Sequence, residues 1–206
     1  MSADLVADAA RAALARPRDL PLAAALPARL ELAIVVTAEP ALEAALPVLL
    51  DTVELLGIPR RHLEFVLACG ADGRARRDAR DRLRTMLAPA RVHAHDVLAG
   101  DTFVAAWLDR EPVRLDDALR ESEAVVLVTG TRSGAAGVAL AGEAVAGLAD
   151  RATRERVSDH VRPLADALPI DLALVIETGV SPRAWAGSGR WLLAERFPPV
   201  ERGVTS

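Results

Sequence analysis

Two histidines and an aspartate lie close together in the sequence VHAHD. His93 and His95 are two positions apart, so a β-strand would point both side chains to one face, and Asp96 follows directly. Two imidazoles and a carboxylate are suitable ligands for Zn²⁺ or Ni²⁺. A complete site needs further ligands, and the other histidines are His62 and His160. His93 and His95 are therefore weak metal candidates, and the alternative is that His95 and Asp96 only hydrogen-bond a neighbouring loop.

A glycine-rich segment follows an apolar run and precedes Ala-rich sequence. Its first residues are Gly130, Thr131, Arg132, Ser133 and Gly134. Backbone N–H groups at the start of a helix bind phosphate, and Arg132 would add positive charge. The pattern predicts a weak site for an anion or a nucleotide-like cofactor, and the alternative is a loop with only a turn function. A short-chain dehydrogenase is excluded, because the sequence has neither the Tyr nor the Lys which that chemistry needs.

Two carboxylates are expected at neighbouring strand ends. Glu39 follows one apolar run and Asp72 follows the next. Paired carboxylates can do acid–base work or hold Mg²⁺, although a single loop aspartate more often stabilises a turn. The candidate catalytic residues are therefore Asp72, His95 and Asp96.

Five short apolar segments must position these groups. Each is a predicted strand, and sequence with helical features lies between most of them. This alternation predicts an α/β fold, a three-layer sandwich with a mainly parallel, Rossmann-like sheet and helices on both faces. We expect one domain over residues 1–206, with ligands beyond the carboxyl ends of the strands. The predicted strands are Leu30–Thr37, Leu63–Cys69, Arg91–Val97, Ala124–Thr129 and Asp171–Glu177.

The remaining segments are predicted in less detail. Residues 3–16 form a helix with one apolar face, and residues 101–115 form a hairpin or extended excursion around Trp107 and Pro112. Residues 183–188 return antiparallel to the last strand. The apolar helix face is expected to contain Leu5, Ala9, Ala12 and Ala13.

Composition limits the classes of function. The sequence has 206 residues, a net charge of −4, 51% hydrophobic but 3% aromatic residues, and one cysteine. The charge gives no case for nucleic acid, and the arginine-rich run from Arg74 to Arg84 is expected to be a solvated helix face. No apolar run reaches the roughly 20 residues of a membrane span, and no secretory signal is recognisable. We expect a cytoplasmic protein with an aliphatic core.

The order of motifs resembles the N-terminal domain of the nickel-pincer lactate racemase family. The resemblance covers about Arg16 to Phe197. It rests on RPRDLPLAAAL, on LAIVVTAEPALEAALPVLLDTVELLGIP, on LEFVLACGADGRA, on VHAHD, on SEAVVLVTGTRSG and on IDLALVIETGVSPRAWAGSGRWLLAE. The resemblance implies the α/β fold predicted above. It also implies that the family's second domain, which closes over the site, has no counterpart in this sequence.

The departures from the family pattern are chemically systematic. Glu39 stands where the family has a substrate-positioning Arg, and Asp72 stands where it has a catalytic His. The family tethers its nickel-pincer nucleotide to a Lys, whereas all 25 basic residues here are Arg. His160 is the only downstream histidine that could replace the family's nickel ligand. We therefore expect no cofactor and no nickel-pincer nucleotide.

Two hypotheses follow from these observations. The first is a stand-alone, catalytically degenerate relative that acts as a binding or subunit protein, as a homo-oligomer or with a partner that supplies the second domain. The alternative is a divergent enzyme on a small hydroxy acid or a phosphorylated ligand, using Asp72, His95 and Asp96.

Overall fold

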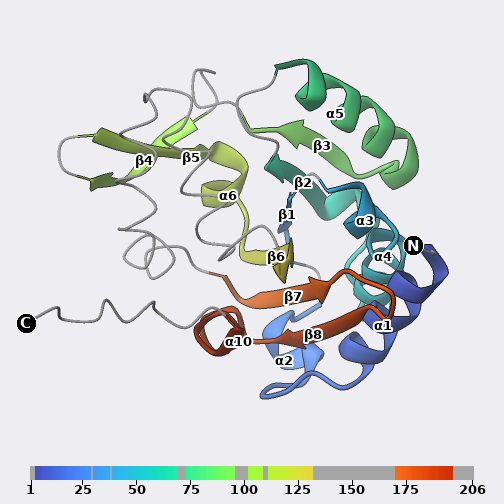
Figure 1. The fold of residues 1–206 in the computed structure, drawn as a ribbon. Helices are drawn as coiled ribbons and strands as arrows, with labels where there is room; N and C mark the ends of the chain where they lie inside the picture. Colours follow the sequence, from blue (N-terminus) through green and yellow to red (C-terminus); the bar gives the residue numbers. More distant parts are fainter. Residues whose placement is uncertain are drawn as a thin grey trace, which may run out of the picture.

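The protein forms an α/β fold around a six-stranded sheet (Figure 1). The computed structural model describes residues 3–28, 30–37, 39–68, 73–95, 102–108, 111–131 and 170–196. The helical sequence predicted up to Leu148, and again over Thr153–Leu168, lies outside these residues. No helix in the described ranges is long and apolar enough to cross a membrane.

The sheet has the order β3-β2-β1-β6-β7-β8. The first five strands in this order pair in parallel, and β8 pairs antiparallel with β7. The prediction of a mainly parallel sheet is therefore confirmed, including the antiparallel return at residues 183–187. The strands are β1 (Leu32–Thr37), β2 (Leu63–Ala68), β3 (Arg91–Ala94), β6 (Ala124–Gly130), β7 (Leu172–Glu177) and β8 (Arg183–Gly187).

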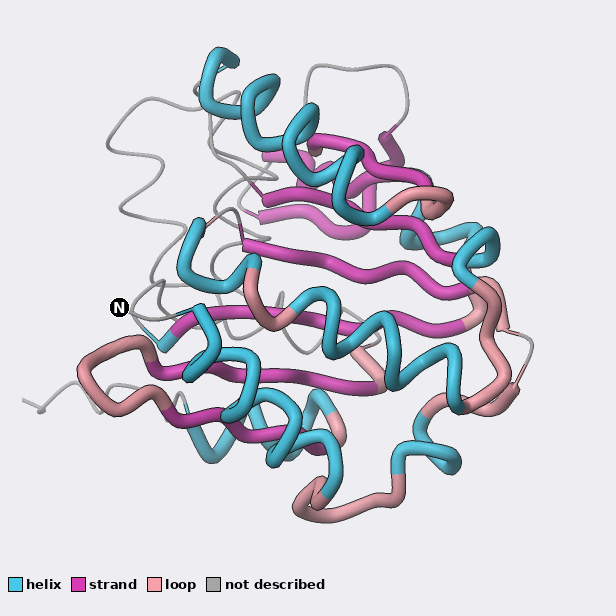
Figure 2. The backbone as a smooth tube through the Cα atoms, turned by 90° about the vertical axis from the view of Figure 1, so that its right-hand side faces the viewer, coloured by secondary structure: helices cyan, strands magenta, loops and turns pink. Residues whose placement is uncertain are grey.

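A layer of helices covers one face of this sheet, which we call the helix face (Figure 2). Three helices pack on it: α1 (Ala3–Ala15), α4 (Leu46–Leu55) and α5 (Gly73–Leu87). Two single-turn helices, α2 (Leu22–Ala25) and α3 (Pro40–Glu43), lie in the connections, as does the 3₁₀ helix Arg60–His62. Alternate strand residues such as Ile34, Phe65 and Leu174 are fully buried on this face.

The opposite face is covered by different elements, and we call it the hairpin face. The antiparallel hairpin of β4 (Thr102–Leu108) and β5 (Glu111–Asp116) leads into α6 (Asp117–Glu121), and α10 (Gly189–Arg196) packs nearby. Trp107 pairs with Pro112 in this hairpin, which confirms the predicted excursion. The buried cluster on the hairpin face combines strand residues with side chains from β5, α6 and α10, such as Leu115, Leu119 and Leu192.

Local sequence explains how α4 begins and ends. Pro47 lies in the first turn, where its missing N–H removes no helical hydrogen bond. Gly57 ends the helix with φ at +87°, a conformation that favours glycine. The chain then turns through Pro59 into β2.

The buried side of α1 differs in part from the prediction: Ala13 is buried as expected, whereas Ala9 is half-buried and Ala12 is exposed. The structure buries Val6, Ala10, Ala13 and Leu14, whereas Leu5 is 48% exposed. The helix is so rich in alanine that two neighbouring stripes are about equally apolar. The larger Val6 and Leu14 side chains decide which stripe faces the sheet, because burying more apolar area releases more free energy.

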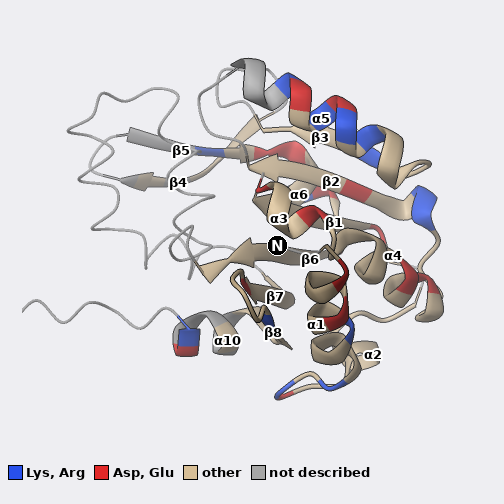
Figure 3. Ribbon diagram, turned by 45° about the vertical axis from the view of Figure 1, so that its right-hand side comes forward, with Lys and Arg blue, Asp and Glu red and all other residues tan. Residues whose placement is uncertain are grey.

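Polar contacts connect the outer elements to each other. Arg82 of α5 donates two hydrogen bonds through Nε to the Glu43 carboxylate, at 3.1 and 3.0 Å. Asp19, in the connector after α1, accepts a hydrogen bond of 2.8 Å from the Ser188 backbone N–H at the start of α10. Charged residues are dense on α5, as predicted for a solvated helix face (Figure 3).

Candidate functional site

The carboxyl edge of the sheet contains the position where such folds bind ligands. The chain runs from β1 outward through β2 to β3 and then returns to β6, on the other side of β1. Connections therefore leave β1 and β6 in opposite directions, and this switch point is where doubly wound sheets bind small molecules. We call the ends of β1 and β6 the switch-point edge.

A pair of threonines marks the switch-point edge. The Thr37 hydroxyl, at the end of β1, donates a hydrogen bond of 3.3 Å to the Thr129 hydroxyl of β6. Thr129 is fully buried, whereas Thr37 is half-buried. Thr129 thus fixes the orientation of a hydroxyl that lies nearer the surface. Such a group can donate or accept a hydrogen bond with a polar ligand.

The predicted glycine-rich site begins beside this threonine pair. Gly130 is the last residue of β6 and pairs with Ile176 of β7, and Thr131 follows as a half-buried residue. Arg132, Ser133 and Gly134 lie outside the described residues. The structure therefore places the start of this segment at the switch-point edge, and the anion site itself stays a prediction.

The candidate catalytic residues are only partly placed. Asp72 and Asp96 lie outside the described residues. His95 is 4% exposed, and its backbone N–H donates to the Leu67 carbonyl at 3.0 Å, which continues the pairing of β3 with β2. Glu39 precedes α3 and is half-buried. The triad of Asp72, His95 and Asp96 thus remains a sequence prediction.

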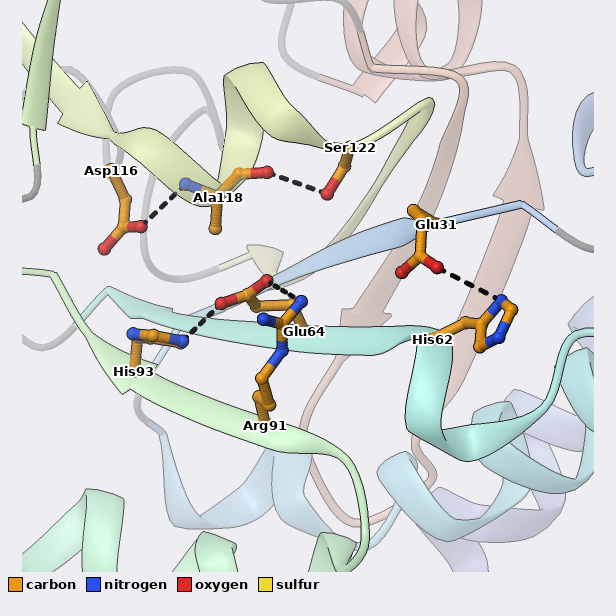
Figure 4. Close-up of polar contacts among 8 residues, drawn as sticks. All are labelled: Glu31, His62, Glu64, Arg91, His93, Asp116, Ala118 and Ser122. Atoms are coloured by element: carbon orange, nitrogen blue, oxygen red, sulfur yellow. Dashed lines mark hydrogen bonds and ion pairs between the residues drawn. The ribbon is translucent and has the colours of Figure 1, made fainter.

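His93 takes part in a polar cluster on the hairpin face. Its Nε2 forms an ion-pair contact with the Glu64 carboxylate of β2, and Arg91 Nη2 lies 2.7 Å from the same carboxylate (Figure 4). Glu64 and Arg91 are register partners of β2 and β3. We call Glu64, Arg91 and His93 the sheet-face cluster. Among the described residues, no group of three or more His, Cys, Asp or Glu side chains is arranged to hold a metal ion.

Asp116 lies close enough to this cluster to interact electrostatically with it. Its carboxylate accepts a hydrogen bond of 3.0 Å from the Ala118 backbone N–H at the start of α6. Burial raises the pKa of the Asp116 carboxyl; the Ala118 hydrogen bond and the charges of His93 and His95 oppose the rise, and the charge of Glu64 adds to it. Asp116 is 7% exposed, so water solvates its charge poorly.

Glu64 is the functional candidate that sequence reasoning missed. It is only 7% exposed, although it lies between Leu63 and Phe65 in an otherwise apolar strand. A carboxylate in such a strand signals either an exposed edge or a buried partner. The sequence around Glu64 does not reveal its partner, because Arg91 lies beside Glu64 only through the pairing of β2 with β3.

A second histidine–carboxylate pair lies near the start of β2. His62 Nδ1 is 3.3 Å from the Glu31 carboxylate, without the geometry of a hydrogen bond (Figure 4). The Glu31 side chain is 48% exposed, compared with 10% for Glu64. The carboxylate of the sheet-face cluster is therefore much less hydrated than Glu31, whereas His93 is 42% exposed and His62 26%.

Comparison with known proteins supports the fold alone. No protein-family profile matches the chain, and no curated protein matches it by sequence. A solved structure of similar fold is the lactate racemase apoprotein from Thermoanaerobacterium thermosaccharolyticum, with a TM-score of 0.58 and 13% identity. The match covers 89% of this chain and 52% of the racemase chain, so this chain spans about half of that protein's length. The fold class implied by the sequence resemblance is thus confirmed.

The nickel-pincer nucleotide does not fit the donor groups of this chain. The resemblance implies a lysine tether, and the sequence contains no lysine. An arginine side chain stays protonated and is no substitute for an amine that must form a covalent bond.

Proposed function

We propose that this chain is a small-molecule-binding relative of the racemase domain, with its ligand at the switch-point edge and without racemase chemistry. The observation that carries the proposal is the hydrogen-bonded pair of Thr37 and Thr129 at the point where the strand order reverses. The buried Thr129 hydroxyl accepts a hydrogen bond from the more accessible Thr37 hydroxyl. This arrangement favours binding, because a threonine hydroxyl is a neutral donor and acceptor at pH 7 and a weak proton carrier.

The described residues offer little acid–base chemistry at this edge. The strand ends provide threonine hydroxyls and backbone groups, and the nearest described carboxylate after β1 is Glu39. The alternative of a divergent enzyme uses Asp72, His95 and Asp96. Of these, His95 is described and is 4% exposed, whereas Asp72 and Asp96 lie outside the described residues. We therefore prefer the binding function.

We also propose that the protein works as an oligomer or with a partner subunit. The match covers 52% of the racemase chain, so about half of that chain lies outside the matched part. The family resemblance implies that this remainder is a second domain that closes over the site. Light scattering at micromolar concentration tests this part of the proposal. A strictly monomeric protein with no co-purifying partner would contradict it.

Thermal unfolding with a panel of small ligands tests the binding site. The panel contains L-lactate, D-lactate, glycolate, ADP and NAD⁺. A ligand at about 100 times its Kd stabilises the folded state by about 2.7 kcal/mol, which raises the melting temperature measurably. We expect the Thr37→Val variant to lose most of that rise.

Thr85→Val is the matched control for this experiment. Thr85 is an exposed threonine on α5, and its hydroxyl donates to the Asp81 carbonyl within the same helix. This variant should keep the full ligand effect. The proposal fails if no compound stabilises the protein, or if both variants respond alike.

A further inference from the structure

The sheet-face cluster has a composition that structural stability does not explain. Glu64 is the second residue of β2 and points away from the helix face, where its neighbours Leu63 and Phe65 are buried. Removing a carboxylate from water is costly, and an apolar residue at such a position is often equally stable or more stable. The Glu64 carboxylate is therefore better explained by the side chains that it orients than by the stability that it adds.

Glu64 contacts two basic side chains that are themselves open to solvent. The Glu64 side chain is 10% exposed, whereas those of Arg91 and His93 are 61% and 42% exposed. Arg91 and His93 both belong to β3, the edge strand of the sheet. The buried carboxylate thus lies beneath two side chains whose outer parts reach water.

Arg91 retains donors beyond the one that contacts Glu64, and His93 retains one when its imidazole is protonated. A guanidinium has five N–H donors in a planar fork, and Arg91 uses Nη2 toward Glu64. His93 uses Nε2, which leaves Nδ1 on the other side of the ring. A guanidinium fork beside an imidazole, held in one orientation, is a suitable donor set for a planar oxyanion.

The charges around the cluster select the class of anion. Glu64 cancels one of the positive charges, so the cluster carries at most a single net positive charge. The other titratable groups near it are His95 of β3 and Asp116 at the junction of β5 and α6. An ionised Asp116 opposes a doubly charged ligand more strongly than a singly charged one. These charges favour a monoanion over a phosphate dianion.

We propose that Arg91 and His93, positioned by Glu64, bind the carboxylate group of a small monoanionic ligand on the hairpin face. This site is separate from the switch-point edge and does not depend on the function proposed there. Glu64 is a positioning residue, because it touches the two donors and not the ligand.

Nuclear magnetic resonance titration of the full chain with sodium acetate tests this proposal. We expect saturable shifts at the Arg91 and His93 signals in the wild type. Arg91→Gln should weaken acetate binding by about tenfold or more, which corresponds to about 1.4 kcal/mol. Arg91→Lys, which keeps the charge but loses the fork, should also weaken it. The second variant covers the case in which the first fails to fold.

His62→Gln is the matched control, because His62 belongs to the other histidine–carboxylate pair. It should leave the acetate affinity unchanged, whereas His93→Gln should lower it. Inorganic phosphate at pH 8 should bind more weakly than acetate. Shifts that do not saturate, or an equal loss in the His62 and His93 variants, would overturn the proposal.

Glu64→Gln separates positioning from simple electrostatics. Removing a negative charge beside an anion site should tighten binding if charge alone matters. Our proposal predicts the opposite result, a several-fold weaker affinity, because Arg91 and His93 lose the ionic contact that orients them. Tighter binding by this variant would show that Glu64 does not position the donors.

Discussion

The two faces of the central sheet bury different kinds of side chain, although the same strands form both. On the helix face, α1, α4 and α5 cover a continuous aliphatic cluster. On the hairpin face, a smaller apolar cluster lies in the same layer as Glu64, His95 and Asp116, which are buried polar residues. Neighbouring residues of one strand can therefore have opposite roles.

Phe65 and Glu64 show this difference most directly. Phe65 is fully buried on the helix face, and Glu64 is nearly as buried on the other face. Buried apolar volume stabilises the fold through packing, whereas a buried carboxylate contributes little net stability even when it is paired. The helix face is therefore expected to hold the fold together, and the hairpin face and carboxyl edge to carry function.

The largest expected effect is at Phe65. Phe65→Ala should lower the free energy of unfolding by about 3–5 kcal/mol, because it removes a large buried ring and leaves a cavity. Urea unfolding followed by circular dichroism measures this loss. A loss below about 1 kcal/mol would mean that the helix face is not the tightly packed one.

A smaller loss is expected at the switch-point edge. Thr129→Val should cost about 1 kcal/mol, because it removes a buried hydroxyl that accepts from Thr37. A double-mutant cycle with Thr37→Val should show a coupling of about 0.5 kcal/mol. Additive losses would show that the two hydroxyls do not interact, and would weaken the proposed ligand site.

Glu64→Met should leave stability within about 1 kcal/mol of the wild type, or raise it, because an apolar side chain of similar length suits a buried strand. Arg91 and His93 remain partly solvated without their partner. Urea unfolding of Glu64→Met and Phe65→Ala in parallel compares the free energy that each face contributes to stability. Equal large losses at both positions would remove the contrast between them.

The pH dependence of stability tests the environment of Asp116. Burial raises its pKa in the folded state above the ordinary value of 3.8, so its stabilising contribution is present below that pH. The contribution is lost as the pH rises through the folded-state pKa. Asp116→Asn keeps an oxygen for the Ala118 N–H, and its stability relative to the wild type should therefore rise as the pH increases above about 4. A difference that stays constant with pH would contradict this account.

The smallest effect is expected at the second histidine–carboxylate pair. His62→Gln should change the free energy of unfolding by less than about 0.5 kcal/mol, because Glu31 is exposed and surface ion pairs contribute little. Thermal unfolding at low and high salt measures it. A loss above about 1 kcal/mol would show that partly exposed pairs in this protein are stronger than expected.

The strands could be predicted from the sequence because they are apolar on both faces. Runs such as LAIVVT and LALVIE are typical of central parallel strands, whichever face each residue takes. The buried stripe of α1 could not be predicted, since alanines surround the helix and only packing against the sheet chooses between two stripes. Met86 shows the same limit on α5. It is spaced to share one apolar stripe with Leu83 and Leu87, which are buried, yet Met86 is 38% exposed.

The candidate site was predictable only in part. The sequence predicted ligand binding beyond the carboxyl ends of the strands, and Gly130 and Thr131 are placed at that edge. The strand order that puts the switch point between β1 and β6 was not predicted. The sheet-face cluster depends on the register that puts Glu64 beside Arg91, and strand register is set by the tertiary fold. The pairing of His93 and His95 on one face was expected, but the contact of His93 with a buried carboxylate was not.

We propose that this chain, which has an α/β fold similar to that of the racemase, lacks racemase chemistry. Chiral chromatography of L-lactate incubated with the protein, isolated from its native cells, tests this claim most directly, with an active lactate racemase as positive control. We predict no D-lactate above the protein-free control. Steady accumulation of D-lactate that scales with protein concentration would contradict the account.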